Sequence, residues 1–501
     1  MLVADPIRQR RVRFRFDASK EMGLGHAYRC LALATALKKE SWLVDFAVSQ
    51  TTLSVFQLEI GEIISLPDGL TLKDEAAHIG RAGGEVDLLV VDHYERNYIF
   101  EECCRTWARK IFVIDDLADR KHDCDLLLDQ TLGRSKEAYM RLVPESCMIL
   151  VGSDYALLRD QFAKQRFCAS KKERCFPPQN IIINVGGTDP KNITKLVIHG
   201  VRLSGYACHL HVVGGEVESN LDYFGLQISK YKNVENMASL YAMADLAIGA
   251  AGTSAWERCC LGLPTLILMT ADNQLPNIQS LIAAQAVRYL GAAEDLTPNS
   301  ISNSVSELFE TPASLVALQR NARLICDGLG VGRVIGRIAQ LFDQDASALV
   351  LRRAERYDCD LVYSWQIEKD ARKYMRVKSP PTYSEHVDWF EAKLHDTRSV
   401  LNIIESIGVP CGVLRADADL EKQHFEISIL LTKSAHGRGI ASNALRLLSK
   451  QLLWADLFAE IQCENRASIN AFLRAGFNQN GSGYLLSRQF LSEATSADST
   501  H

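Results

Sequence analysis

The chain has 501 residues, which at roughly 150 residues per domain corresponds to about three domains. Hydrophobic residues make up 47% and charged residues 23%, a composition that excludes a disordered tail protein, a collagen-like fibre and a low-complexity chain. The 56 Lys and Arg against 61 Asp and Glu give a net charge of −5, which excludes an overall basic field that would attract nucleic acid or anionic lipid.

Apolar runs and cysteines indicate the compartment. No uninterrupted apolar run approaches the roughly 18 residues of a membrane span, and the N-terminal residues lack the apolar segment of a secretory signal. The 14 cysteines include the adjacent pairs Cys103–Cys104 and Cys259–Cys260 and no C-x-x-C motif. We therefore expect reduced thiols, mostly small core residues, in a cytoplasmic protein with no membrane span.

The first third of the chain alternates strand-like and helix-like patterns. Val12, Phe14 and Phe16 alternate with two arginines, as in a strand, and a helix is expected at about 26–40. Further strands are expected at 87–92 and 110–115. This alternation predicts a parallel sheet covered by helices on both faces.

Five arginines lie near the N-terminus, and they raise the question of nucleic-acid binding. Because the chain as a whole is acidic, we interpret them instead as a solvated arm followed by an edge strand. They are Arg8, Arg10, Arg11, Arg13 and Arg15.

A second strand–helix series and a third region follow. The polar stretch 164–179 is expected to be a linker, and strands are expected at 180–188, 209–215, 245–253 and 264–269. After a short separator at 343–349, strands at 399–405, 410–415 and 424–432 with a helix from about Gly439 indicate an α+β domain. The expected domains are 11–163, 178–342 and 350–490.

The motif GLGHAYR places Gly23, Gly25, His26 and Arg29 between the first expected strand and helix. Glycines allow close approach of the backbone to a ligand, and a helix N-terminus offers free N–H groups. The dinucleotide fingerprint is incomplete because Tyr28 stands at its third glycine position, so a dehydrogenase is disfavoured. His26 is a candidate site residue, and a purely structural histidine is the alternative.

Two acidic motifs follow the next strands. Asp92, His93 and Tyr94 come directly after the apolar run 88–91 of the second expected strand, at the same carboxyl edge as His26, where a ligand crevice is expected. An ordinary loop is the alternative. Asp115 and Asp116 end the next strand, where they could orient a base or cap a helix.

The second series carries the motif GAAGTSAWERCCLGLP. Its small-residue turn precedes a helix that Thr253 or Ser254 could cap and that holds Glu257. A backbone nest at this turn suits a diphosphate, and a carboxylate one helical turn further suits a ribose diol. The turn Gly186-Gly187-Thr188 is expected to face the same cleft, with an ordinary turn as the alternative, and Asp272-Asn273-Gln274 follows the strand that begins at Pro264.

These motifs together resemble GT-B nucleotide-sugar enzymes, and more closely the UDP-sugar hydrolases of the pseudaminic-acid pathway, over residues 11–340. The resemblance implies a GT-B-like pair of doubly wound Rossmann-type α/β domains that release UDP from a UDP-2,4-diacetamido-2,4,6-trideoxyhexose. It implies His26 as the base or positioner of water, Tyr94 and Asn273 at the sugar, and Glu257 at the uridine ribose. The implied substrate-binding set is Gly25, Arg29, Gly187, Gly252, Thr253, Ser254 and Glu257.

UDP is a good leaving group, so one base with a pKa near neutrality suffices in principle, in contrast to the two carboxylates of ordinary glycoside hydrolysis. No D-x-D metal motif is evident apart from Asp123-Cys124-Asp125, which we interpret as structural. We therefore expect a reaction that needs no metal.

The third region resembles N-acetyltransferases of the GNAT superfamily through HGRGIASNALRLL and ENRASINAFLRAGF. The resemblance implies acetyl-CoA as co-substrate, with its pyrophosphate on the backbone of the loop His436, Gly437, Arg438, Gly439, Ile440 and Ala441. His436 replaces the usual Gln or Arg, and Asn465 is the expected second contact. Phe472 stands where the family often has a tyrosine that acts as the general acid, and Tyr484 is a candidate substitute for that role. His424 and Glu426 are candidates to receive the amine proton, although a structural role is the simpler interpretation for exposed strand residues.

The expected function is thus a bifunctional enzyme that N-acetylates a UDP-4-amino-sugar and then releases UDP from it, with a UDP-sugar and acetyl-CoA as small-molecule partners. Three alternatives stay open. One is a GT-B glycosyltransferase with a hydroxyl acceptor, another is a hydrolase of a related legionaminic or sialic-acid-like pathway, and the third is a non-catalytic nucleotide-sugar sensor.

Overall fold

The computed structural model describes residues 9–19, 22–168, 174–186, 189, 192–215, 226–342 and 349–488. These residues divide into two compact units. The first extends to Val331, and the second begins at Gly332 and also includes Arg166–Cys168.

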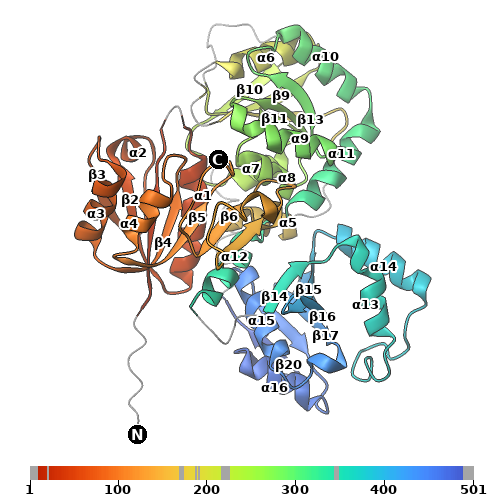
Figure 1. Ribbon diagram of the computed structural model, residues 1–501. Helices are drawn as coiled ribbons and strands as arrows, with labels where there is room; N and C mark the ends of the chain where they lie inside the picture. The colour runs from red at the N-terminus through yellow and green to blue at the C-terminus, as the bar shows by residue number, and fades with distance from the viewer. Residues whose placement is uncertain are drawn as a thin grey trace. The chain divides into compact units, whose positions relative to one another are not determined.

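The first unit opens with a parallel sheet whose strand order is β3-β2-β1-β4-β5-β6-β7 (Figure 1). The order reverses between β1 and β4, and such a switch point is where doubly wound sheets bind ligands, at the carboxyl ends of the strands. The strands are β1 (Arg11–Phe16), β2 (Leu43–Ser49), β3 (Glu62–Leu66), β4 (Val86–Asp92), β5 (Ala108–Ile114), β6 (Leu126–Asp129) and β7 (Met148–Val151). The helices are α1 (Gly25–Lys39), α2 (Gln50–Val55), α3 (Leu72–Gly83) and α4 (Tyr98–Cys104).

A second parallel sheet, of order β10-β9-β8-β11-β12-β13, completes this unit. Its strands are β8 (Asn180–Asn184), β9 (Cys208–Val213), β10 (Leu226–Tyr231), β11 (Leu246–Ala250), β12 (Thr265–Met269) and β13 (Arg288–Ala292). The helices that follow in the chain are α5 (Asp160–Cys168), α6 (Ile193–Leu203), α7 (Met237–Met243), α8 (Ser254–Cys260), α9 (Leu275–Ala283), α10 (Pro298–Phe309), α11 (Pro312–Ile325) and α12 (Gly330–Gln340).

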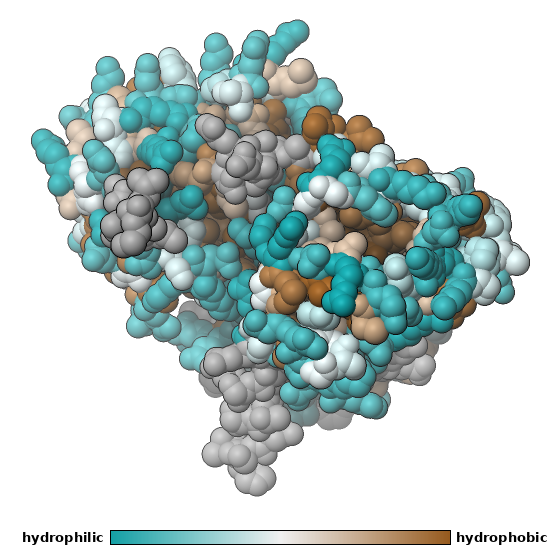
Figure 2. Space-filling view, turned by 90° about the horizontal axis from the view of Figure 1, so that it is seen from below, coloured by the Kyte–Doolittle hydropathy of each residue, from teal (hydrophilic) through white to brown (hydrophobic). Residues whose placement is uncertain are grey.

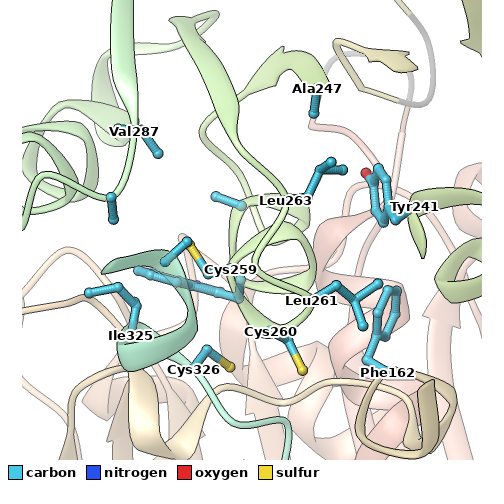
Figure 3. Packing of buried hydrophobic residues seen from close by; sticks show 14 of the residues in the cluster. Phe162, Tyr241, Ala247, Cys259, Cys260, Leu261, Leu263, Val287, Ile325 and Cys326 are labelled. Atoms are coloured by element: carbon cyan, nitrogen blue, oxygen red, sulfur yellow. The ribbon is translucent and has the colours of Figure 1, made fainter. Parts of the chain in front are cut away.

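The core of this second sheet lies on both of its faces. Ile182 packs into one hydrophobic cluster while its neighbours Ile181 and Ile183 pack into another, as the alternation of side chains along a strand requires. Figure 3 shows the first cluster, where Cys259 and Cys260 lie among apolar side chains as free thiols. These cysteines therefore act as small core residues, in agreement with the prediction.

The interpretation of the N-terminal arginines as a solvated arm and edge strand was wrong for β1. This strand pairs with β2 and β4 and is interior to the sheet. Arg13 is fully buried and contacts Asp45 at 2.8 Å, and Arg15 contacts Glu75 at 2.7 Å. In a sheet covered on both faces the alternating arginines cannot reach solvent, so buried carboxylates compensate their charge.

The expected linker at 164–179 was also partly wrong, because α5 continues through Cys168. Phe167 on its last turn packs against Phe425 and Trp454, with ring centroids 5.1 and 5.8 Å away, all within the second unit. The polar composition of this stretch gave no indication that Phe167 packs in an aromatic cluster.

The second unit has one mixed sheet of order β14-β15-β16-β17-β18-β20-β19, in which only β17 and β18 pair in parallel. Its strands are β14 (Leu349–Arg353), β15 (Ser399–Ser406), β16 (Val409–Asp419), β17 (His424–Leu431), β18 (Leu457–Glu460), β19 (Asn478–Asn480) and β20 (Gly483–Leu486). Its helices include α13 (Cys359–Gln366), α14 (Tyr383–His395), α15 (Ile440–Gln451) and α16 (Arg466–Arg474). Two doubly wound sheets followed by an α+β unit confirm the expected fold class.

On the face drawn in Figure 2, hydrophilic residues predominate and hydrophobic residues appear in separate patches. Among the helices that the structure describes, none combines the length and apolar character needed to cross a membrane.

Candidate functional site

The switch point of the first sheet brings His26 and Asp92 to one sheet edge. His26 is the second residue of α1, which follows β1, and Asp92 is the last residue of β4, the parallel neighbour of β1. Gly23 has a φ of +82°, a conformation that favours glycine, where the chain turns from β1 toward α1. The imidazole of His26 and the carboxylate of Asp92 therefore lie at the same sheet edge.

His26 and Asp92 form a buried pair that Arg29 extends. His26 Nδ1 lies 2.6 Å from Asp92 Oδ1, a contact that places the ring proton on Nδ1 and leaves Nε2 as an acceptor. Arg29 donates to both oxygens of Asp92, at 2.6 and 2.5 Å, and to Asp116 at 3.2 Å. Burial alone would raise the pKa of Asp92, but Arg29 and His26 hold it well below its ordinary value, so Asp92 is a carboxylate.

Tyr94 and Asn273 meet beside this pair. The Tyr94 ring packs edge-on against His26 with centroids 4.7 Å apart. Asn273, in a short turn after β12, donates to the Tyr94 hydroxyl at 3.0 Å. Burial and the neighbouring Asp116 raise the pKa of Tyr94, which keeps the phenol protonated. The two residues expected at the sugar are therefore in contact, although 179 positions separate them in sequence.

Sequence reasoning did not select Asp92 or Asp116 as site residues, although it noted both strand ends. The available signal was a carboxylate at the last position of a buried strand. Asp115 instead accepts from the backbone N–H of Ala118 at 2.9 Å, within a turn after β5. No helix begins at this turn, which lies within the described residues 22–168, so the helix-capping alternative was wrong.

His93 connects the Tyr94 loop to the residue that follows β1. Its Nδ1 accepts from the backbone N–H of Glu95 at 3.0 Å, so its Nε2 carries the proton and donates to Asp17 at 3.1 Å. Burial lowers the pKa of His93, which is consistent with a neutral ring. This histidine therefore has a structural role in the loop.

The turn before α8 approaches the start of α1. A Cβ added to Gly25 would lie 3.1 Å from Thr253 Oγ1, whereas one added to Gly252 would meet no atom within 4 Å. Neither predicted cap accepts from a backbone N–H of α8: Thr253 holds the N-cap position without such a bond, and the Ser254 hydroxyl accepts from the side chain of Arg258 at 3.1 Å. That capping prediction was wrong because Arg258 engages the hydroxyl.

The N-terminus of α1 is open to an anion. Leu24 at the N-cap makes no side-chain hydrogen bond, and the first turn has no acidic residue. The first N–H groups of a helix lack intrahelical partners and carry a partial positive charge. Gly187, the other predicted loop residue, lies outside the described residues together with Thr188.

Glu257 on α8 is 8% exposed. Burial raises its pKa, while Arg159, whose Nη2 donates to Oε1 at 3.3 Å, acts in the opposite direction. A carboxylate has about four acceptor positions, so Glu257 retains capacity to accept from a diol.

Within the described residues, no group of three or more His, Cys, Asp or Glu side chains is placed to hold a metal ion. Asp123 and Asp125 both pair with Arg105, at 3.0 and 2.5 Å, and so contribute to structure.

The second unit has a separate candidate site between β17 and α15. Gly437 and Gly439 both have a φ of +73°, and a Cβ on either would meet no atom within 4 Å. His436 and Arg438 are exposed, while Ile440 is buried, so its contribution to a ligand is limited to its backbone. The loop therefore presents backbone N–H groups at the start of a 12-residue helix.

The strands next to this loop diverge. Within residues 349–488, all of them described, β17 pairs with β18 only at Phe425–Leu457 and Glu426–Phe458, so the rest of β17 is open on that side. Arg376 bridges Glu426 at 2.5 Å and Glu460 at 2.7 Å. An opening of this kind exposes backbone groups to which an extended ligand can hydrogen bond.

The remaining candidates of this unit have ordinary structural contacts. Asn465 caps α16 by accepting from Ser468 N at 3.2 Å. Phe472 packs on Phe477 with centroids 4.9 Å apart, Tyr484 is buried on β20, and the His424 ring lies on Phe458. None of these contacts identifies a proton donor or acceptor.

Two family models match the chain. The glycosyltransferase family 28 C-terminal domain matches residues 146–325, and the acetyltransferase (GNAT) domain matches residues 348–478.

Three curated relatives match part of the chain. An uncharacterized protein of Methanocaldococcus jannaschii, MJ1062, is 26% identical over 52% of this chain and 55% of its own length. The spore coat polysaccharide biosynthesis protein SpsG of Bacillus subtilis is 25% identical over 64% of this chain and 94% of its own. The UDP-2,4-diacetamido-2,4,6-trideoxy-beta-L-altropyranose hydrolase of Campylobacter jejuni is 30% identical over 37% of this chain and 63% of its own.

Among solved structures, MurG of Acinetobacter baumannii aligns with 66% of this chain and 99% of its own, at 16% identity and a TM-score of 0.48. The acetyltransferase RimL aligns with 28% of this chain and 92% of its own, at 16% identity and a TM-score of 0.26. The chain is thus a homologue of a UDP-sugar hydrolase, with a match to the glycosyltransferase family 28 C-terminal domain at 146–325 and a GNAT domain at 348–478.

Proposed function

We propose that this chain, a homologue of the Campylobacter hydrolase that also has a GNAT domain, is a bifunctional nucleotide-sugar enzyme. It N-acetylates a UDP-4-amino-sugar and releases UDP from the resulting UDP-2,4-diacetamido-2,4,6-trideoxyhexose. The observation that carries the proposal is the buried His26–Asp92 pair beside Tyr94 and Asn273, on the same chain as the GNAT domain. In this proposal the functional domains are residues 11–163, 178–342 and 350–490. The enzyme acts in the cytoplasm, in the pseudaminic-acid pathway.

In the hydrolase site, His26 Nε2 takes a proton from water as the water oxygen bonds to the anomeric carbon. The bond from that carbon to the UDP oxygen breaks, and UDP leaves with the electron pair. Asp92 accepts from Nδ1 and stabilises the imidazolium, as in other His–carboxylate pairs. Arg29 holds Asp92, and Tyr94 and Asn273 contact the sugar.

The nucleotide is bound by the facing segments of the two sheets. Backbone groups at Gly25 and at Gly252–Ser254 contact the diphosphate, where charge develops on the leaving group. Gly187 belongs to the same site in the proposal, and Glu257 accepts from the ribose diol. The proposal assigns no role to a metal.

In the GNAT domain, the backbone of residues 436–441 holds the pyrophosphate of acetyl-CoA, with Asn465 as a further contact. The substrate amine attacks the thioester carbonyl, its proton passes to a base, and the CoA thiolate leaves. Glu426 and His424 are the candidate bases in this proposal.

Reaction in heavy-oxygen-labelled water tests the hydrolase. If water attacks the anomeric carbon, mass spectrometry finds the label in the sugar and none in UDP. Label in the phosphate of the nucleotide, or release that requires a second sugar or lipid hydroxyl, would contradict the proposal. The latter result would instead support a glycosyltransferase, an alternative that the family 28 match favours.

Glu257→Gln should weaken UDP binding about ten-fold with little change in kcat, because a neutral amide replaces the carboxylate that accepts from the diol. Calorimetric titration with UDP measures this. Glu307→Gln, at an exposed carboxylate of α10, is the control and should leave affinity unchanged.

Gly439→Val should reduce acetyl transfer at least about ten-fold and leave UDP release unchanged. A β-branched residue is strained at a φ of +73°, so the loop and the first turn of α15 must shift. Assays of both half-reactions on one preparation measure this, and equal loss of both would contradict independent sites.

A further inference from the structure

One arginine connects the candidate nucleotide site to the helix that holds His26. Arg159 lies immediately before α5, and its guanidinium donates to Glu257. The same guanidinium lies over the ring of Tyr28 on α1, 4.8 Å from the centroid, and 5.5 Å from the centroid of Phe162. Its position is thus fixed by two aromatic rings and one carboxylate.

Burial favours the neutral form of Glu257, and the contact with Arg159 opposes this effect. The charged or titratable groups next to Glu257 in the described residues are Arg159, Arg258 and Tyr241. Arg258 is engaged by Ser254 and by the carbonyl of Ala250, at 3.1 and 2.7 Å, while burial raises the pKa of Tyr241 to about 12 and keeps it neutral. Arg159 is therefore the cation that directly hydrogen bonds to this buried carboxylate.

Arg159 also has unused donor capacity. Its Nε is buried and has no hydrogen-bond partner among the described residues, and its single hydrogen bond to Glu257 is 3.3 Å long. A guanidinium offers five donors in a fixed fork, so a ligand at Glu257 can be accommodated without loss of the ion pair.

We infer that Arg159 is a positioning residue of the nucleotide site, which keeps Glu257 ionised and oriented for the ribose diol while the Tyr28 ring holds the guanidinium in place. This inference rests on the proposed function, in which Glu257 binds the ribose. Because Tyr28 is two residues from His26, the stack also joins the ribose site to the helix of the proposed base.

The test compares Arg159→Met, Arg159→Lys and wild type by calorimetric titration with UDP from about pH 5 to pH 8. Ionised Glu257 binds the diol, so affinity falls as pH falls through its pKa. Loss of Arg159 raises that pKa, so in Arg159→Met the fall begins at a higher pH. We expect about ten-fold weaker binding near neutrality and a raised KM with kcat changed less than about two-fold. Lys restores the charge without the planar stack and should give an intermediate affinity.

Lys39→Met is the matched control. Lys39 on α1 pairs with Asp160, the neighbour of Arg159, at 2.8 Å, but this pair is exposed, so its loss should change UDP affinity less than about two-fold. Thermal unfolding checks that each variant is folded. If Arg159→Met matches wild type at every pH while Glu257→Gln loses affinity, the inference is overturned and the proposed function stands. If wild type and Glu257→Gln bind UDP equally, the nucleotide-site assignment itself fails.

Discussion

His26→Ala should reduce UDP release about 10²–10⁴-fold and leave acetyl transfer within about two-fold of wild type. The substitution removes the only group proposed to accept the proton of the attacking water, while the GNAT domain keeps all of its own residues. Phosphorus NMR measures free UDP, and a thiol assay measures CoA release from the same preparation.

His122→Ala is the matched control for His26→Ala. His122 is also a buried histidine of the first unit, with Nδ1 2.7 Å from Glu101 Oε1, but its carboxylate is on α4 and not at the end of β4. It loses a similar pair and should retain UDP release per folded molecule. Loss of both activities in His26→Ala would indicate a folding defect, and unchanged UDP release would remove His26 from the mechanism.

Asp92→Asn should also reduce UDP release about 10²–10⁴-fold. An amide at this position can donate to His26 Nδ1, which would move the ring proton to Nε2 and take away the acceptor that water needs. The substitution also removes the carboxylate that takes both hydrogen bonds of Arg29 at 2.6 and 2.5 Å, so the free energy of unfolding should fall by about 3–5 kcal/mol. Turnover assays below the unfolding transition, with denaturant titration, separate the two effects.

Asp45→Asn separates chemistry from stability. Asp45 on β2 is likewise buried and pairs with the fully buried Arg13 at 2.8 Å, but it has no contact with His26. We expect a comparable loss of stability with normal turnover per folded molecule. A normal rate in Asp92→Asn would show that this carboxylate does not orient the base.

Much of the architecture was predictable because strand and helix periodicities repeat along the chain. The strand expected at 87–92 is β4 (Val86–Asp92), and the helix expected at 26–40 is α1 (Gly25–Lys39). Since parallel strands end at one sheet edge, His26 and Tyr94 could be placed together from the sequence. That Tyr94 and Asn273 share one site was expected from a family resemblance, because no local pattern relates residues in different sheets; their hydrogen bond was found only in the structure.

The errors arose where burial depends on tertiary context. Arg13 and Arg15 look solvated by residue type, yet β1 is interior, a position that strand order alone decides. Phe167 lay in a polar stretch, and its aromatic partners are far away in sequence. Asp92 was noted as a strand end, but its pairing with His26 depends on which strand lies beside β1, so the sequence did not distinguish it from an ordinary loop residue.

The most direct test of the central claim is incubation of the intact chain with a UDP-4-amino-sugar, with and without acetyl-CoA, followed by mass spectrometry of the sugar. If one chain performs both reactions, a free diacetamido sugar, UDP and CoA form when acetyl-CoA is present. Without acetyl-CoA, we expect little UDP release from the amino-sugar. Complete turnover without an acetylated product, or an acetylated UDP-sugar that keeps its UDP, would contradict the claim that one chain performs both reactions.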